Sequence, residues 1–165
     1  MEKKNEIGNY ANSITYQIDA NEEDYLYVQE SKIAEAGKGL FTAVTIYKDE
    51  IICVFKGEQL SEDEALRRAL AGEDRYFINM LHGGIMDSMH VNCFAKYAND
   101  VVGTLFKTNS KITLDENDHV CIVATRRIAA YEEIFCSYGK RYWKGKVSLK
   151  CESESMQTLS LSHLS

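Results

Sequence analysis

The sequence of 165 residues contains no proline, although average usage of about 5% would give roughly eight. Its turns therefore rest on glycine, asparagine and aspartate. It also has no run of about 18 apolar residues, so we expect no membrane-spanning helix. The first residues, MEKKNEIGNYANS, carry no apolar segment of the kind found in secretory signals. We therefore expect an intracellular protein, in the cytoplasm or the nucleus, that is not secreted.

Cysteine is present, but without a recognisable pattern. The five cysteines are odd in number and widely spaced, which fits neither a disulfide framework nor a paired zinc motif; they are Cys53, Cys93, Cys121, Cys136 and Cys151. Reduced thiols are the simplest interpretation. The spacing of His82, His90, Cys93 and His119 favours neither a thiol–imidazole pair nor a metal site, so we expect no metal.

The bulk composition is that of one acidic globular domain. Hydrophobic residues make up 45% of the chain and charged residues 27%, and the net charge is −6. Non-specific nucleic-acid binding needs a basic surface, so we expect no direct contact with nucleic acid. We divide the chain into a polar lead-in over 1–24, one domain over 25–146 and a serine-rich tail over 147–165.

The residue patterns predict a mainly β protein with short helices. The clearest helix follows Ser61, which can cap it with Glu64 at the capping-box position, and Gly72 lies at its end. Ala65, Leu66, Ala69 and Leu70 would form its apolar face. Strand patterns occur in 25–33, 35–44, 49–60 and 132–138. Two strands around the glycines at 83–84 are expected in 75–89, and a hairpin is expected in 109–128. A short helical turn is expected in 91–100.

Four separated motifs carry the functional signal. They are AGKGLF at 36–41, RYF at 75–77, FAKYAND at 94–100 and VATRRIAAYEEIFCSYGKRYW at 123–143. Their order resembles that of the SET-domain family of protein lysine methyltransferases, and the resemblance covers about residues 25–146. It implies several small twisted sheets with a threaded C-terminal segment, a rare arrangement among folds. It also implies S-adenosylmethionine as the methyl donor, with the target lysine entering a narrow channel from the opposite face.

The resemblance also implies residue roles. Tyr138 matches the catalytic tyrosine, whose hydroxyl would lie beside the transferring methyl group. Methyl transfer from a sulfonium is an in-line displacement, which needs aligned reactants and a neutral lysine amine rather than a metal. The positions that match the family's donor contacts are Lys38, Gly39, Leu40, Tyr76, Tyr97, Asn99, Asp100, Tyr142 and Trp143. Those that match the lysine channel are Phe55, Cys136 and Tyr138.

Some of these roles have alternatives. Tyr76 would lie beside the methionine end of the donor, and Tyr142 and Trp143 would cover its adenine by stacking. For Tyr76 and Trp143, ordinary packing in the core is the alternative role. The family often has phenylalanine or tyrosine where this chain has Cys136. The smaller side chain predicts room for di- or trimethylation.

Three departures from the family pattern bear on activity. Asp100 replaces the usual histidine after the motif asparagine, and Phe55 replaces a channel tyrosine. Tyr131 replaces a glycine, so we expect the backbone of Tyr131 to have a negative φ. The leading interpretation is a lysine methyltransferase that acts on a protein or peptide, with a basic histone tail as one candidate, and with a homodimer left open. The alternative is an inactive SET-like module that binds a peptide or partner.

Overall fold

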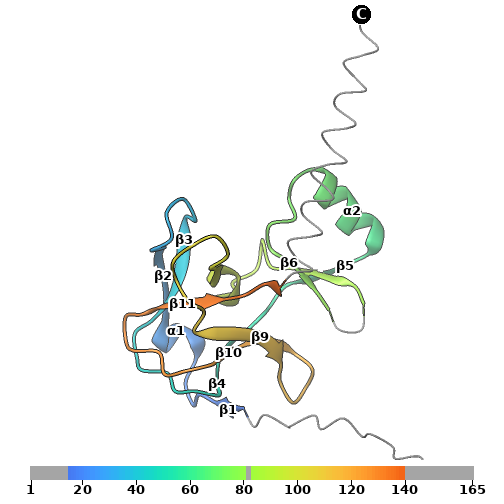
Figure 1. Cartoon of the computed structure of the whole chain (residues 1–165). Helices are drawn as coiled ribbons and strands as arrows, with labels where there is room; N and C mark the ends of the chain where they lie inside the picture. Colours follow the sequence, from blue (N-terminus) through green and yellow to red (C-terminus); the bar gives the residue numbers. More distant parts are fainter. Residues whose placement is uncertain (1–14, 81–82, 140–165) are drawn as a thin grey trace, which may run out of the picture.

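Three small β-sheets form the framework of the computed structural model, which describes residues 15–80 and 83–139 (Figure 1). The first sheet has the order β1 (Tyr16–Gln17), β4 (Glu50–Val54), β10 (Val120–Ala124) and β9 (Ser110–Leu114). The second has the order β2 (Leu26–Glu30), β3 (Lys38–Thr42), β11 (Glu133–Cys136) and β8 (Asn99–Asp100). The third has the order β5 (Glu58–Leu60), β7 (Ile85–Asp87) and β6 (Phe77–Asn79). The prediction of a mainly β fold is confirmed.

The helices are few and short, namely α1 (Glu22–Tyr25), α2 (Glu62–Leu70) and the 3-10 turn η1 (Ala95–Tyr97). The hydroxyl of Ser61 accepts the backbone N–H of Glu64 at 3.3 Å, so the predicted cap is present. Arg68 joins α2 to the third sheet, because its guanidinium donates to Asp87 of β7 at 2.8 Å. The predicted apolar face is only partly correct: Ala65 is buried, whereas Leu66 and Leu70 are exposed.

The main core lies between elements of the first two sheets. It includes Leu40, Ile52, Ile122 and Ile134, which are all fully buried. All five residues of β10 are buried, as expected for a strand that is covered on both faces. The four described cysteines, Cys53, Cys93, Cys121 and Cys136, are buried free thiols.

The C-terminal strand β11 is inserted between two earlier strands. It pairs antiparallel with β3 and parallel with β8, where Phe135 lies opposite Asn99 and Cys136 opposite Asp100. The pairing with β8 joins residues that are 36 positions apart in the sequence (135 − 99). It brings the end of β11, and the residues that follow it, against the motif at 94–100.

The described part of the lead-in, residues 15–24, contributes β1 and most of α1. Glu22 accepts the backbone N–H of Val54 at 2.9 Å and so links α1 to the end of β4. The division of the chain at residues 24 and 146 remains a prediction, since 1–14 and 140–165 lie outside the described residues. Within the described ranges, no helix has the length and apolar character needed to cross a membrane.

The turn before β11 differs from the expectation. Tyr131 has φ = +68°, so the prediction of a negative φ is wrong. Its backbone N–H donates to the carbonyl of Thr42 at 2.6 Å, and its side chain is 70% exposed. The turn therefore keeps the left-handed conformation that favours glycine, although a bulky residue occupies the position.

Candidate functional site

Two adjoining cavities share one wall in the described part of the chain. The apolar cavity has a volume of about 260 Å³ and the polar cavity about 470 Å³. Four side chains line both, namely Arg75, Tyr76, Lys96 and Tyr138. The apolar cavity is otherwise lined mainly by Phe55, Phe77, Ile78, Ile112 and Val120, and the polar cavity by Glu35, Lys38, Tyr97, Asn99 and Asp100.

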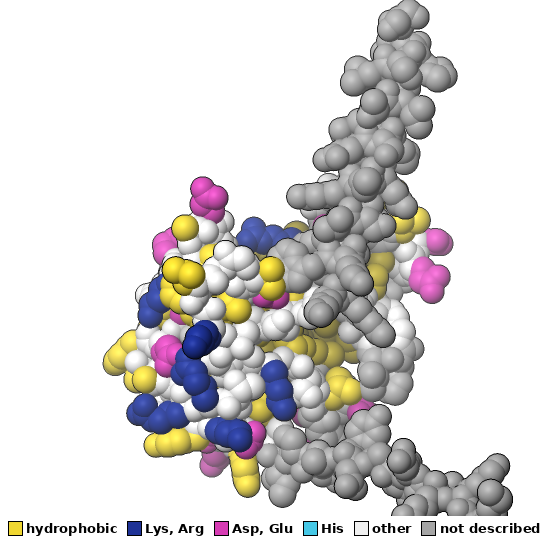
Figure 2. Space-filling view, viewed as in Figure 1, with side chains coloured by type: hydrophobic (Ala, Val, Ile, Leu, Met, Phe, Trp, Pro, Cys, Tyr) yellow, Lys and Arg dark blue, Asp and Glu magenta, His cyan; other side chains and the backbone are white. Residues whose placement is uncertain are grey.

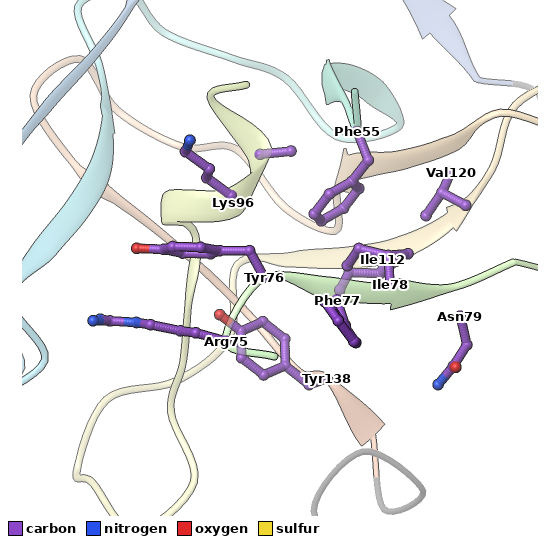
Figure 3. A pocket seen from close by; sticks show the side chains of 11 residues that line it. Phe55, Arg75, Tyr76, Phe77, Ile78, Asn79, Lys96, Ile112, Val120 and Tyr138 are labelled. Atoms are coloured by element: carbon purple, nitrogen blue, oxygen red, sulfur yellow. The ribbon is translucent and has the colours of Figure 1, made fainter. Parts of the chain in front are cut away.

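Tyr138 is held at two points by the motif at 94–100. Its hydroxyl donates to the carbonyl of Ala98 at 2.7 Å, and its backbone N–H donates to Oδ2 of Asp100 at 2.7 Å. In Figure 3 the Tyr138 ring lies below Tyr76, with its hydroxyl end toward Arg75 and Tyr76. The pairing of β11 with β8 therefore places this phenol where the two cavities meet.

Asn99 joins the same motif to the glycine turn that precedes β3. Its side-chain amide donates to the backbone carbonyl of Lys38 at 3.0 Å. Gly37, the first glycine of this turn, has φ = +75°, a conformation that glycine adopts without steric cost. Asn99 thus fixes the backbone along one edge of the polar cavity.

Gly39 is required by close packing inside the second sheet. A Cβ atom at this position would lie 2.2 Å from Oε1 of Glu133. The Glu133 carboxylate is fully buried, where it accepts the hydroxyl of Ser31 at 2.6 Å and the backbone N–H of Lys32 at 2.7 Å. Leu40 is also fully buried and belongs to the core, and neither Gly39 nor Leu40 lines either cavity.

Two cations flank the ring of Tyr76. The Arg75 guanidinium and the Lys96 ammonium each lie 5.4 Å from the ring centroid, within the range of cation–π attraction. Figure 3 shows the ring between these two side chains. The ammonium of Lys96 also donates to the carbonyls of Ser88, Met89 and Val91, at 3.0, 3.2 and 3.0 Å. Tyr76 is therefore fixed in place, with Tyr97 edge-on at 6.4 Å.

Sequence reasoning missed Arg75 and Lys96 as parts of the site. Each directly precedes an aromatic residue of a motif, Tyr76 and Tyr97, and this adjacency was the available signal. It also assigned Tyr76 to the donor alone, whereas the ring lines both cavities.

The predicted channel residues occupy different depths. Phe55 is 7% exposed and lines the apolar cavity, as does Tyr138. Cys136 points to the same side as Tyr138, since its thiol lies 3.4 Å from the same Ala98 carbonyl. It is nevertheless fully buried, burial raises its pKa, and it lines neither cavity. The prediction that Cys136 leaves room for further methyl groups therefore lacks geometric support.

Two predicted donor contacts fall beyond the described part of the chain. Tyr142 and Trp143 lie in 140–165, outside the described residues, as does the cationic group Lys140, Arg141, Lys144 and Lys146. The described residues contain no group of three or more histidine, cysteine, aspartate or glutamate side chains that could hold a metal ion.

Comparison with protein families and curated sequences gives consistent matches. The family model described as the SET domain matches residues 37–139. The chain is 35% identical over 117 residues to the histone-lysine N-methyltransferase mes-2 of Caenorhabditis elegans. That match covers 68% of this chain but only 15% of the relative.

Solved structures give the same result for the fold. An apo ctPRC2 in an autoinhibited state has a TM-score of 0.60 at 25% identity, over 69% of this chain and 15% of that one. An autoinhibited ctPRC2 bound to S-adenosylmethionine has a TM-score of 0.59 at 26% identity, over 70% and 15%. A humanized mutant of the Chaetomium thermophilum Polycomb Repressive Complex 2, bound to the inhibitor GSK343, has a TM-score of 0.58 at 25% identity, over 69% and 15%. The chain therefore spans about 15% of the length of these relatives.

Proposed function

The chain belongs to the SET-domain family, and on this basis we propose that it is an S-adenosylmethionine-dependent protein-lysine N-methyltransferase. One observation carries the proposal: Tyr138 lies in the wall shared by a polar and an apolar cavity. A transfer between two reactants that enter from opposite sides needs this arrangement. The names of the relatives support the same chemistry, since one is a histone-lysine N-methyltransferase and another was solved with S-adenosylmethionine.

The polar cavity suits the methyl donor. S-adenosylmethionine carries a carboxylate, an ammonium, a sulfonium and ribose hydroxyls. The cavity offers the charged side chains of Glu35 and Lys38 and the backbone of the glycine turn. The Asp100 carboxylate at its rim is already bonded to two backbone N–H groups. We propose that the turn at 37–39 and Asn99 form the main donor contacts, with Tyr97 and Tyr76 as aromatic walls. We also propose that Tyr142 and Trp143 contact the adenine of the donor.

The apolar cavity suits the side chain of the target lysine. Phe55, Phe77 and Ile112 can pack against the four methylenes of a lysine, which bury well on apolar surfaces. Its amine would then reach the hydroxyl of Tyr138. Desolvation in this cavity, together with the positive charges of Arg75 and Lys96, would lower the pKa of the incoming ammonium. The neutral amine has the lone pair that the displacement requires, and no metal is needed.

We propose a protein or peptide as the substrate, with a histone tail as the first candidate because the curated relative acts on histones. The net charge of −6 favours a basic substrate during encounter. We also propose that the protein acts in the nucleus or cytoplasm without direct contact to nucleic acid.

The second candidate function is an inactive SET-like module that binds a peptide or partner. The observation in its favour is Asp100, which stands where the family has histidine. Calorimetric titration with S-adenosylmethionine, followed by incubation of core histones with methyl-labelled donor, separates the two. An enzyme binds the donor and labels lysine. Binding without label would favour the module, and absence of donor binding would contradict the proposed enzyme.

A further inference from the structure

Both carboxylate oxygens of Asp100 accept backbone N–H groups. Oδ2 accepts the N–H of Tyr138 at 2.7 Å, and Oδ1 accepts the N–H of Val102 at 2.8 Å. Asp100 is half-buried at the rim of the polar cavity. The same side chain therefore organises the segment after β8 and also holds the backbone of Tyr138.

The contact with Tyr138 begins where the strand pairing stops. The ladder between β8 and β11 has two residue pairs, and its last pair is Asp100 with Cys136. Beyond this pair, the carboxylate of Asp100 takes the place of a backbone acceptor for Tyr138. With the bond from the Tyr138 hydroxyl to the Ala98 carbonyl, the residue is held at both its backbone and its phenol by one three-residue segment.

We propose that Asp100 is a positioning residue for Tyr138, and that this chain requires a carboxylate at this position. The inference rests on the proposed function, because Tyr138 is the residue being positioned. The reason for the requirement is geometric: the two oxygens face two different N–H groups. An asparagine would turn its NH₂ group toward one of these donors. A histidine offers at most one acceptor nitrogen.

Asp100 differs from the residues that hold the glycine turn. The bond from Asn99 to the Lys38 carbonyl links the motif to the donor side, and it does not involve the Asp100 carboxylate. Loss of the carboxylate should therefore displace Tyr138 more than it disturbs the donor contacts. A displaced catalytic group lowers kcat, whereas a lost donor contact raises the Kd of the donor.

The test compares Asp100→Asn, Asp100→His and Asp100→Glu with wild type and with Asp63→Asn, a matched change at an exposed site on α2. We expect Asn and His to lower kcat by about tenfold to a hundredfold, the usual effect of a misplaced group, with donor Kd within about threefold of wild type. Glu keeps both acceptors and should retain more activity than Asn. The control should match wild type.

Amide hydrogen exchange by NMR gives a readout that does not depend on activity. The Tyr138 amide should be protected in wild type and exchange faster in Asp100→Asn, without a matching change in the core strand β10. An unprotected Tyr138 amide in wild type, or Asp100→His with wild-type kcat, would overturn the role of Asp100. A fall in kcat matched by an equal loss of donor affinity would also overturn it. A wild type that transfers no methyl group would instead overturn the proposed function.

Discussion

At the scale of single residues, the site depends on polar side chains that bond to backbone rather than to one another. Asn99 bonds to the Lys38 carbonyl, Tyr138 to the Ala98 carbonyl, and Lys96 to three carbonyls in 88–91. Each such bond fixes a loop next to the shared wall. Removal of one partner leaves a carbonyl without its donor, so the effects should be local and measurable.

Asn99→Ala should weaken binding of the methyl donor by about 1–3 kcal/mol, since the Lys38 carbonyl loses its bond and the glycine turn loses its link to β8. Calorimetric titration with S-adenosylmethionine measures the change. Asn117→Ala, at an exposed position in the β9–β10 turn, is the control. Unchanged donor affinity in Asn99→Ala would limit Asn99 to a structural role.

The motifs identified Tyr138 and Asn99, and the structure places both at the polar cavity. The sequence could not show that Cys136 lies behind the wall, because alternation along a strand gives the side of a residue but not its depth. The sequence did not predict Arg75 and Lys96 as site residues, because a cation next to an aromatic residue in the sequence is common on protein surfaces. Only the fold shows that both flank Tyr76.

At the scale of elements, local residue patterns located most helices and strands correctly, but they did not predict which distant strands pair. The β9–β10 hairpin, the antiparallel β6 and β7, the capped helix α2 and the turn η1 lie where the residue patterns predict them. The parallel pairing of β8 with β11 joins distant segments. The family resemblance implied a threaded C-terminal segment but did not specify this pairing. The exposure of Leu66 and Leu70 also follows from the placement of α2, which periodicity alone cannot give.

The turn before β11 makes its own prediction. Tyr131→Gly should stabilise the protein by about 1 kcal/mol, because glycine adopts φ = +68° without the steric cost that a side chain carries. This figure is the net gain after subtracting the entropic cost of glycine, whose unfolded chain is more flexible. Tyr131→Ala is the matched control, since alanine keeps the Cβ atom and should give no such gain. Urea unfolding measures both. Equal stability of the glycine and alanine variants would show that strain at this turn is negligible.

At the scale of the whole molecule, stability against acid should depend on the segment that leads into β11. Glu132 accepts hydrogen bonds from Arg126 at 2.6 Å, the Ala129 N–H at 3.0 Å and Asn109 at 3.3 Å. Burial raises the pKa of Glu132, but these three hydrogen bonds lower it by more than burial raises it, and the bond from Arg126 has the largest effect among them. The pKa of Glu132 therefore lies below its ordinary value. A depressed pKa means that the contribution to stability is present above the ordinary value and is lost as the pH falls through the folded value.

Glu132→Gln should therefore flatten the acid limb of the stability curve. Between about pH 5 and pH 3, around and below the ordinary glutamate pKa, wild type should lose more unfolding free energy than the variant. Urea titrations over this range give the comparison. Parallel curves for the two proteins would show that Glu132 does not contribute to acid sensitivity.

The site is assembled from segments that lie far apart in the sequence, namely 35–38, 75–79 and 95–100 together with residues 55, 112, 120 and 138. Figure 2 shows basic and apolar side chains interspersed over one face, without a continuous acidic surface in that view. We propose that methyl transfer takes place at the wall shared by the two cavities.

The most direct measurement compares wild type with Tyr138→Phe for transfer of a labelled methyl group to lysine in the same histone preparation, with donor Kd measured in parallel. Wild type should label lysine. The phenylalanine variant should bind donor within about threefold of wild type yet transfer at least about a hundredfold more slowly, because only the hydroxyl that steers the amine is lost. Full turnover by Tyr138→Phe, or a wild type that binds donor and labels no lysine, would contradict the account.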